Sequence, residues 1–296
     1  MKECKMVIDT IAINSDINNF NDFTIVNKDN FDYVERLGEI IDNRTQKLSM
    51  RVKINLHTKY GHTTINSTKK HSEYLENALN ELGIVELREV TMERIDIAID
   101  TNDIDFKNDF KKLLFAFELL TIKHKRNARW YTTNLNSLQN NSIKLHDSRF
   151  ELEIYDKGLE SNNVYPYKTR LEMRYKRLNK GVGDTDIYIN KTLEKINQMD
   201  GHLETLEMNM ANRLITLWEL EQGKIKSFSE FVRKYNDYFY TLNILKVVYK
   251  ASGLKGSYSK WLEKFRITNK LEFYTKSDIK QMQKAMIKSI KNYNKN

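Results

Sequence analysis

Cysteine and proline are almost absent from this chain of 296 residues, which contains one of each, Cys4 and Pro166. A single cysteine excludes an internal disulfide framework, and no cluster of cysteine and histidine has the spacing of zinc ligands. Long hydrophobic runs are also absent: none approaches the roughly 20 apolar residues that a membrane-spanning helix needs. The first residues lack the apolar core of a signal peptide. We therefore expect a soluble, cytoplasmic protein in a reducing environment, with no membrane partner.

Basic residues are abundant, and their position is informative. The chain carries a formal net charge of +9, and its 40% of hydrophobic residues is typical of a folded protein. Residues 201–296 contain 18 Lys and Arg against 9 Asp and Glu, whereas residues 1–200 contain 31 of each. A basic region with interleaved tyrosines favours a polyanionic partner, most often nucleic acid. The alternative is a solvated, lysine-rich helical surface.

The spacing of hydrophobic residues changes near residue 200. Before it, alternating patterns predict strands over 4–14, 47–57, 84–100 and in short segments up to 157, and helical patterns predict helices over 72–82 and 106–120. This order predicts an α+β fold: an antiparallel sheet with helices on one face and the other face open to a substrate. The pattern after residue 200 is all-helical. We therefore expect an α+β domain over 1–200 and a helical, basic domain over 201–296.

Capping residues mark several helix ends. Ser227 and Glu230 have the spacing of a capping box, and Gly223 follows a helical pattern as a C-cap would. Asp105 similarly precedes the second helix of the first domain. In the second domain, helices are predicted over 202–222, 227–236, 242–252, 257–265 and 277–293. The helix over 257–265, which follows a glycine turn, is the best candidate for a DNA recognition element.

Three segments alternate polar and apolar residues with a period of two: Arg94-Ile-Asp-Ile-Ala-Ile-Asp100, Glu151-Leu-Glu-Ile-Tyr-Asp-Lys157 and Thr169-Arg-Leu-Glu-Met-Arg-Tyr-Lys176. As strands, they place apolar residues on one face and carboxylates, a tyrosine and basic residues on the other. In one sheet, they would gather the groups that metal-assisted phosphate chemistry with a tyrosine nucleophile requires. The alternative is that these charges form the solvated face of an antiparallel sheet, joined in cross-strand pairs.

The order and spacing of these motifs resemble those of rolling-circle replication initiators. The resemblance covers about residues 90–180 and extends to initiators of small staphylococcal-type plasmids, conjugative-element relaxases and gene II replication proteins of filamentous phages. It implies an enzyme whose tyrosine hydroxyl attacks one DNA phosphodiester at an origin, becomes linked to the 5′-phosphate and releases a 3′-hydroxyl that primes synthesis. It also implies an origin DNA, single-stranded or hairpin, as partner, and leaves open a homodimer and a host helicase and polymerase.

Four carboxylates are candidate ligands for the Mg²⁺ or Mn²⁺ that this chemistry requires: Asp96, Asp100, Glu153 and Glu172. Asp96 and Asp100 lie four residues apart on one strand, about 13 Å, which is too far for both to bind one ion. We therefore favour Asp96 paired across strands with Glu172, and keep Asp100 as the alternative. The motifs thus predict a carboxylate metal site on the polar face.

Tyr155 is the favoured nucleophile, because it shares the polar side of its strand with Glu153 and Lys157. An unperturbed tyrosine hydroxyl has a pKa of about 10, so we expect Lys157 to lower this pKa or to hold the scissile phosphate. Contacts to DNA phosphates are expected from Arg94, Arg170 and Arg174. Tyr175 lies on the apolar side and is the second candidate, because a bulge in its strand would reverse the faces. Tyr188 is the third.

Other functions and other ligands stay open at this point. The chain could be a non-catalytic, sequence-specific DNA-binding protein or regulator derived from an initiator, or an RNA-binding module. Many rolling-circle nucleases hold their metal with a histidine–hydrophobe–histidine triplet, which is absent here. His57 and His146 could supply a third ligand, although a lone histidine is more often structural. Trp218 and the pair Trp130-Tyr131 are expected in the core rather than as base-stacking platforms.

Overall fold

The computed structural model describes residues 4–16, 33–37, 49–55, 91–124, 129–132, 142–161, 166–181, 184–269 and 271–293. Its strands are β1 (Cys4–Asp16), β2 (Tyr33–Leu37), β3 (Ser49–Asn55), β4 (Thr91–Thr101), β5 (Arg129–Thr132), β6 (Ser142–His146), β7 (Phe150–Asp156) and β8 (Thr169–Gly181). They form one 8-stranded sheet in the order β2-β3-β1-β4-β8-β7-β6-β5. Neighbouring strands pair antiparallel throughout.

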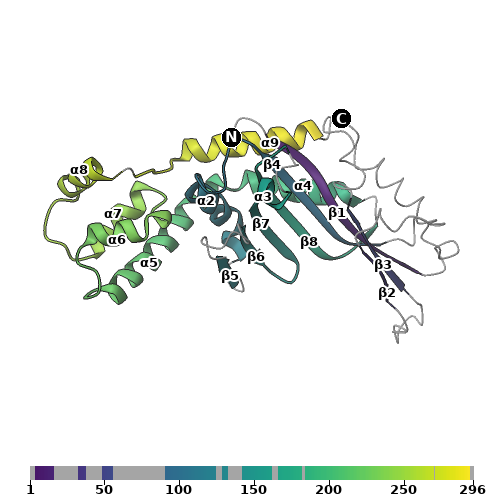
Figure 1. The fold of residues 1–296 in the computed structure, drawn as a ribbon, viewed down its shortest axis with the longest axis horizontal. Helices are drawn as coiled ribbons and strands as arrows, with labels where there is room; N and C mark the ends of the chain where they lie inside the picture. Colours follow the sequence, from purple (N-terminus) through teal and green to yellow (C-terminus); the bar gives the residue numbers. More distant parts are fainter. Residues whose placement is uncertain are drawn as a thin grey trace.

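Along the chain, the described helices lie between and after the strands of this sheet (Figure 1). They are α2 (Phe110–Thr121), α3 (Lys157–Glu160), α4 (Thr185–Asn197), α5 (Leu203–Glu221), α6 (Phe228–Lys234), α7 (Leu242–Ala251), α8 (Tyr258–Thr268) and α9 (Lys276–Tyr293). Short 3-10 turns join some of them, at Ile122–His124, Asp200–His202 and Asn236–Tyr238. The predicted fold class, an antiparallel α+β sheet followed by a helical region, is confirmed.

One face of the sheet carries the hydrophobic core. Ile95, Ile97 and Ile99 of β4 are each at most 1% exposed, and their register partners on β8 include Met173 and Leu171, which are also buried. Helix α9 packs against β1, α2 against β6 and β7, and α4 against β4. Period-two alternation thus places the apolar residues of the three motifs under these helices.

The register between β8 and its neighbours is continuous where it matters for the polar face. Strand β8 pairs with β4 from Thr169 to Lys176 without a shift in register. It pairs with β7 from Thr169 to Tyr175, also without a shift. No bulge therefore reverses the faces between Arg170 and Tyr175. A shift lies further along, where Met92 and Arg94 of β4 pair with Lys180 and Lys176.

Several predicted element bounds differ from the structure. The helix expected from residue 106 begins at Phe110, because the Asp105 carboxylate accepts backbone N–H groups of Lys107 and Asn108 and closes a turn there. Helix α4 was not predicted, although its buried positions repeat at helical spacing. The predicted helix over 72–82, the predicted strand over 84–90 and His57 lie outside the described residues.

The C-terminal helices follow their capping signals closely. The Ser227 side chain accepts the backbone N–H of Glu230, and the Glu230 carboxylate accepts that of Lys226, which together hold the start of α6. Gly223 after α5 has a φ of +90°, a conformation that glycine adopts at little cost. None of the helices in the described ranges is long and apolar enough to span a membrane.

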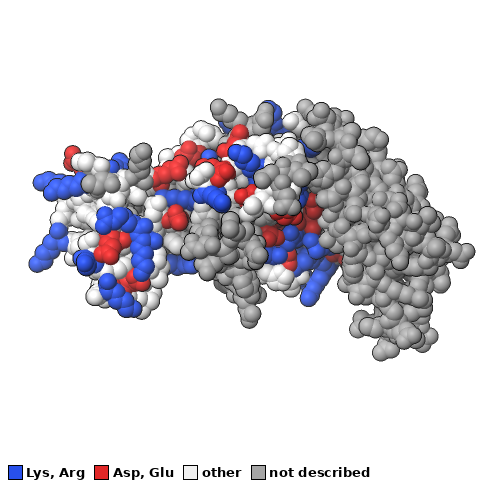
Figure 2. Space-filling view, viewed as in Figure 1, with Lys and Arg blue, Asp and Glu red and all other residues white. Residues whose placement is uncertain are grey.

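The helical region has two different relations to the sheet. Helices α5 to α8 form a lobe beside it, and Figure 2 shows lysines and arginines on the surface of this lobe. Helix α9 instead returns to the sheet, where it packs on β1 and α4 (Figure 1). The domain boundary at residue 200 stays a prediction.

Candidate functional site

The three motifs form adjacent strands, and their polar residues lie in rows across the sheet. Asp96 of β4 pairs with Arg174 of β8, which pairs with Glu151 of β7. One row further along, Glu172 pairs with Glu153. The next row joins Asp100, Arg170 and Tyr155. Alternation within each strand and this register together bring every predicted polar site residue of the motifs to one face, apart from Lys157.

Three carboxylates meet at the centre of this face. Ligand oxygens of Asp9, Asp96 and Glu172 all lie within 4.8 Å of one another. Asp96 and Glu172 are 1% and 2% exposed, and the Asp9 side chain is 14% exposed, so two of the three carboxylates are buried and the third is half-buried. Three carboxylates at this separation are a donor set suited to a hard divalent cation such as Mg²⁺ or Mn²⁺.

Asp9 is the member of this group that sequence reasoning missed. On β1, Ile8 pairs with Ile97 and Thr10 pairs with Asp96, so Asp9 is the extra residue of a β-bulge. A bulge bends its strand and redirects one side chain. In the sequence, Asp9 follows Met6, Val7 and Ile8 inside an apolar run. A charged residue within such a run was the sequence feature that could have indicated a functional role for Asp9.

Each of the three carboxylates is paired with a different arginine. Arg94 donates from Nε and Nη2 to the two Asp96 oxygens at 2.7 and 2.5 Å. Arg174 donates from Nε to Glu172 Oε1 at 2.5 Å. Arg170 donates from Nη1 to Asp9 Oδ1. The arginines balance the charge of the buried carboxylates and hold their orientations.

The carboxylate of Asp96 is the most strongly perturbed of the group. Burial raises its pKa, the hydrogen bonds from Arg94 oppose that rise, and the nearby charge of Glu172 adds to it, so that the pKa reaches about 7. When two carboxylates are buried side by side, a nearby cation stabilises their ionised forms. The electrostatics of the group therefore favour a bound cation.

Tyr155 lies beside this group. Its hydroxyl donates to Glu172 Oε2 at 3.0 Å. Burial raises the pKa of Tyr155 well above its ordinary value, the charge of Glu172 adds to the rise, and Arg170 opposes it. The expectation that the pKa of Tyr155 is lowered is therefore wrong for the chain without a bound cation, because the hydroxyl is buried against carboxylates.

Lys157 does not lie where the motif placed it. It is the first residue of α3 rather than a strand residue, and its ammonium donates to Glu160 Oε2 in an ion pair of 2.6 Å. The same ammonium lies 5.7 Å from the centre of the Tyr155 ring, over its face. Lys157 thus lies over the face of the Tyr155 ring.

The other two tyrosine candidates lie on the opposite face of the sheet. Tyr175 is 6% exposed, and its hydroxyl is 2.9 Å from Thr192 Oγ1 of α4. Its ring packs against Phe150 and Tyr188, the latter at 5.3 Å between ring centroids. Tyr188 is 4% exposed on α4. Both belong to the core under the helices, and neither is near the three carboxylates.

Asp100 and Arg170 form a second, deeper ion pair. Arg170 donates from Nε and Nη2 to the two oxygens of Asp100 at 2.7 and 3.0 Å, and both residues are 0% exposed. Arg170 Nη1 donates to Asp9 Oδ1. Asp100 is therefore not one of the three clustered carboxylates, and Arg170 lies too deep to present its guanidinium to solvent.

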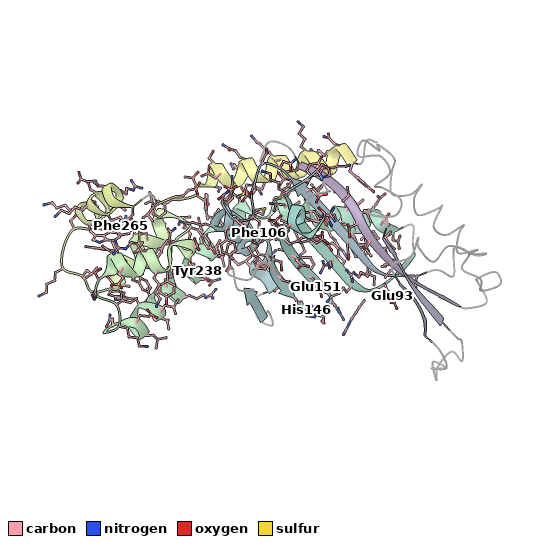
Figure 3. All side chains as sticks on the ribbon, in the orientation of Figure 1. Glu93, Phe106, His146, Glu151, Tyr238 and Phe265 are labelled. Carbon is pink, nitrogen blue, oxygen red and sulfur yellow. The ribbon has the colours of Figure 1, made fainter. Side chains whose placement is uncertain are left out.

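Glu153 is an ion-pair partner at the side of the group. Its carboxylate is 2.8 Å from Arg174 Nη2 and 3.6 Å from Lys144 Nζ. His146, in contrast, lies at the end of β6 with its side chain 58% exposed, and it pairs with Glu151 (Figure 3). Neither residue belongs to the carboxylate group.

Of the aromatic residues expected in the core, the structure describes the side chain of Trp218 only. Trp218 is 8% exposed and packs edge-on against Phe228 and Phe231, so it is a core residue as predicted. The side chains of Trp130 and Tyr131 lie outside the part of the structure that is described. His202 contacts the last turn of α2, where its Nδ1 lies 2.9 Å from the carbonyl oxygen of Leu119, a hydrogen-bond acceptor.

Comparison with known proteins adds one finding. No protein-family model and no curated protein matches this chain. Among solved structures, the chain is similar to "Structure of Rolling Circle Replication Initiator Protein from Geobacillus stearothermophilus", with 14% sequence identity and a TM-score of 0.33. The similarity covers 58% of this chain and 74% of that one. A TM-score of this size carries no argument about function, so the site is interpreted from its own residues.

Proposed function

We propose that this chain is a replication initiation protein that nicks and rejoins DNA at an origin, with Tyr155 as the nucleophile and a divalent cation as cofactor. One observation carries the proposal: the Tyr155 hydroxyl donates to Glu172, which belongs to a group of three carboxylates within 4.8 Å of one another. A nucleophile within hydrogen-bond reach of a cation site is the arrangement that phosphodiester transfer needs.

Asp9, Asp96 and Glu172 are the residues that would hold the cation. The fit rests on the donor set, which consists only of carboxylate oxygens, and on their spacing. When bound, Mg²⁺ or Mn²⁺ would polarise a phosphate oxygen and stabilise the charge that develops on the phosphate. This set keeps the predicted pair Asp96 and Glu172 and adds Asp9. Asp100 and Glu153 take supporting places outside it.

The chain's own residues then account for the transfer. Tyr155 Oη forms a bond to the phosphorus of one phosphodiester, and the bond between phosphorus and the 3′ oxygen breaks. The phenol proton passes to Glu172, the acceptor of its hydrogen bond. The 3′ oxygen takes up a proton from water and leaves as a free hydroxyl, and the proton held by Glu172 returns to water. The 5′-phosphate stays linked to Tyr155, and the reverse sequence of steps rejoins the strand.

The three arginines have different tasks in this proposal. Arg94 and Arg174 have side chains 31% and 15% exposed, so they can contact DNA phosphate as well as carboxylate. Arg170 is fully buried and acts as a positioning residue, since it joins Asp100 to Asp9 and lies opposite Tyr155 in the register. Lys157 packs over the Tyr155 ring and orients it.

The helical lobe supplies a DNA-binding surface outside the site. Residues 203–268, which span α5 to α8, contain 11 Lys and Arg against 7 Asp and Glu. Such an excess binds the DNA backbone through counterion release. We assign origin recognition to this lobe and strand cleavage to the sheet, in a cytoplasmic protein that starts rolling-circle replication of a plasmid or phage.

The test is a covalent adduct between protein and DNA. The purified chain is incubated with Mn²⁺ or Mg²⁺ and single-stranded oligonucleotides that tile its own coding region and flanks, and the products are separated on a denaturing gel. We expect an adduct that requires the cation, is lost in Tyr155→Phe and remains in Tyr175→Phe. Tyr175→Phe is the matched control because it removes a tyrosine hydroxyl from the opposite face of the same sheet.

A second function accounts for the same chain without catalysis. The pairing of each carboxylate with an arginine also suits a sheet face that is only structural, in a DNA-binding regulator. Tight DNA binding with no adduct from any oligonucleotide would support that reading and overturn the nicking proposal. An adduct that persists in Tyr155→Phe would retain the activity but reject the nucleophile.

A further inference from the structure

Four basic side chains converge on one carboxylate beside the candidate site. Glu151 of β7 contacts Lys176 Nζ at 2.5 Å, Arg174 Nη1 at 3.3 Å and Lys144 Nζ at 3.8 Å, and it also pairs with His146 Nδ1. The basic residues come from β6 and β8, on either side of β7. We call Lys144, His146, Arg174 and Lys176 the cation cluster.

The cation cluster adjoins the three carboxylates. Arg174 belongs to both places, because its Nε contacts Glu172 at 2.5 Å while its Nη1 contacts Glu151. Glu151, Arg174 and Asp96 also share one row of the sheet. A DNA strand whose scissile phosphate lies at the carboxylates would therefore pass its neighbouring phosphates over the cation cluster.

Glu151 occupies the interior of the cluster, and Lys144 and His146 lie on its exposed side. The side chain of Glu151 is 8% exposed, whereas those of Lys144 and His146 are 32% and 58% exposed. The side chains of Arg174 and Lys176 lie between these values, at 15% and 18%. Figure 3 shows Glu151 and His146 close together on the strands of the sheet. Burial opposes ionisation of Glu151, but the hydrogen bond from Lys176 and the surrounding cations lower its pKa to about 2. It therefore stays charged and holds the cations in place.

The donors of the cluster exceed what this carboxylate can accept. Lys144 Nζ is 3.6 Å from Glu153 and 3.8 Å from Glu151, which is beyond ordinary hydrogen-bond length to either oxygen. An ammonium has three donors, and a phosphate has oxygens that can accept them. The outer side of the cluster thus has the charge and the donors for an anion larger than one carboxylate.

We propose that Lys144, His146 and Lys176 form a subsite for a backbone phosphate of single-stranded DNA next to the scissile phosphodiester, with Glu151 as the internal anion that fixes its geometry. This deepens the proposed function and rests on it, since it assigns the position of the substrate strand. The strand runs from Tyr155 along β7 towards Glu151 and the end of β6 at His146.

The test measures binding without cleavage. A fluorescent single-stranded oligonucleotide is titrated in EDTA with proteins that carry Tyr155→Phe, over a series of salt concentrations. We expect Glu151→Gln to bind several-fold tighter, because the cations lose their internal partner. We expect Lys144→Ala with Lys176→Ala to bind at least tenfold more weakly and to lower the salt slope by about 1, as for loss of one to two phosphate contacts.

Matched controls lie on α4, on the other face of the sheet. Glu194→Gln makes the same single charge change at an exposed position there, and Lys191→Ala with Lys284→Ala, the second on the neighbouring helix α9, removes two exposed lysines. These variants should leave the affinity unchanged. If Glu151→Gln binds no tighter than Glu194→Gln, or if the double lysine variant binds like the parent protein, the cluster is only a structural ion network and the proposal is wrong. A thermal melt of each variant confirms that the comparison is between folded proteins.

The result separates the subsite from the proposed activity. Altered binding by the cluster variants with no covalent adduct in the parent protein would retain the phosphate subsite and reject the nickase. A tyrosine adduct in the parent protein with unaltered binding by the cluster variants would retain the nickase and reject the subsite. The failure of the subsite and the failure of the proposed activity are therefore distinguishable.

Discussion

At the scale of single residues, the site depends on charges that are buried together. Asp96, Glu172, Asp100 and Arg170 are at most 2% exposed, and such groups are tolerated only where opposite charges and hydrogen bonds compensate for lost hydration. The arginines supply that compensation in the chain without a cation. A bound cation would share the carboxylates with the arginines. Substitution of any one carboxylate should therefore change the affinity for the cation.

Substitution of Asp9 is the most direct test of the proposed cation site, because the bulge in β1 is what brings Asp9 to the other two carboxylates. We expect Asp9→Asn to weaken Mn²⁺ binding at least tenfold, since it removes one of three anionic ligands while keeping the shape of the side chain. Calorimetric titration with Mn²⁺ measures this. Asp186→Asn, at an exposed position of α4, is the control. Equal affinity of Asp9→Asn and the parent would remove Asp9 from the site.

At the scale of elements, helix α2 is tied to the C-terminal segment by one buried amine. Lys111 is 7% exposed, and its Nζ donates to the Glu272 carbonyl oxygen at 2.6 Å and to Asn236 Oδ1 at 3.3 Å. Burial lowers the pKa of Lys111 to about 8, although Asp237 and Glu272 oppose the shift. The contact joins the sheet's covering helix to the chain that leads into α9.

This amine predicts a pH dependence of stability. Because the folded pKa of Lys111 lies below the unfolded one, the unfolded chain binds more protons between pH 8 and 10.5, and stability rises with pH in that window. From pH 7.5 to 9.5 the Lys111 contribution grows by about 2 kcal/mol. In Lys111→Met this increment should be absent from the urea unfolding free energy.

The comparison is a difference between proteins, because other groups titrate in the same range. Lys107→Met, at an exposed position just before α2, should keep the increment of the parent protein. If Lys111→Met and the parent gain equal stability over this window, the amine is not buried as described.

At the scale of the whole molecule, the chain divides its charge between two kinds of surface. The sheet face carries acidic and basic side chains intermixed at the carboxylates and the cation cluster, and the lobe of α5 to α8 carries a basic excess (Figure 2). Mixed charge suits a cation and one strand of DNA, whereas a basic excess suits the backbone of a duplex. The proposed activity needs both surfaces.

Helix α8 tests the role of the lobe. Lys260 and Lys264 are exposed on it. We expect Lys260→Ala with Lys264→Ala to weaken binding to a hairpin origin and to lower its salt slope by up to about 2, while the yield of adduct with a short single strand is unchanged. Lys284→Ala with Lys288→Ala, at exposed positions of α9, is the matched control. Equal loss in both pairs would mean a general charge effect rather than a DNA-binding surface on α8.

Much of the fold was predictable because its signals are local. Alternation within β4, β7 and β8 depends only on neighbouring residues, and so do the caps of α6 and the glycine after α5. The lack of a shift between Arg170 and Tyr175 preserved the face on which Tyr155 lies and kept Tyr175 in the core. Helix α4 was missed because its apolar stripe is narrow, with five buried residues among thirteen.

The sequence by itself determined the antiparallel α+β class, the helical basic C-terminal region and the common face of Asp96, Glu172 and Tyr155, since a period of two assigns each side chain to a face. Only the tertiary structure decided that β1 is the neighbour of β4 and that its bulge brings Asp9 to the other carboxylates. It also decided that Arg170 is buried, that Lys157 begins a helix and that the pKa of Tyr155 is raised. The physical reason is that faces follow from local geometry, whereas strand neighbours, bulges and burial depend on contacts between residues far apart in the chain.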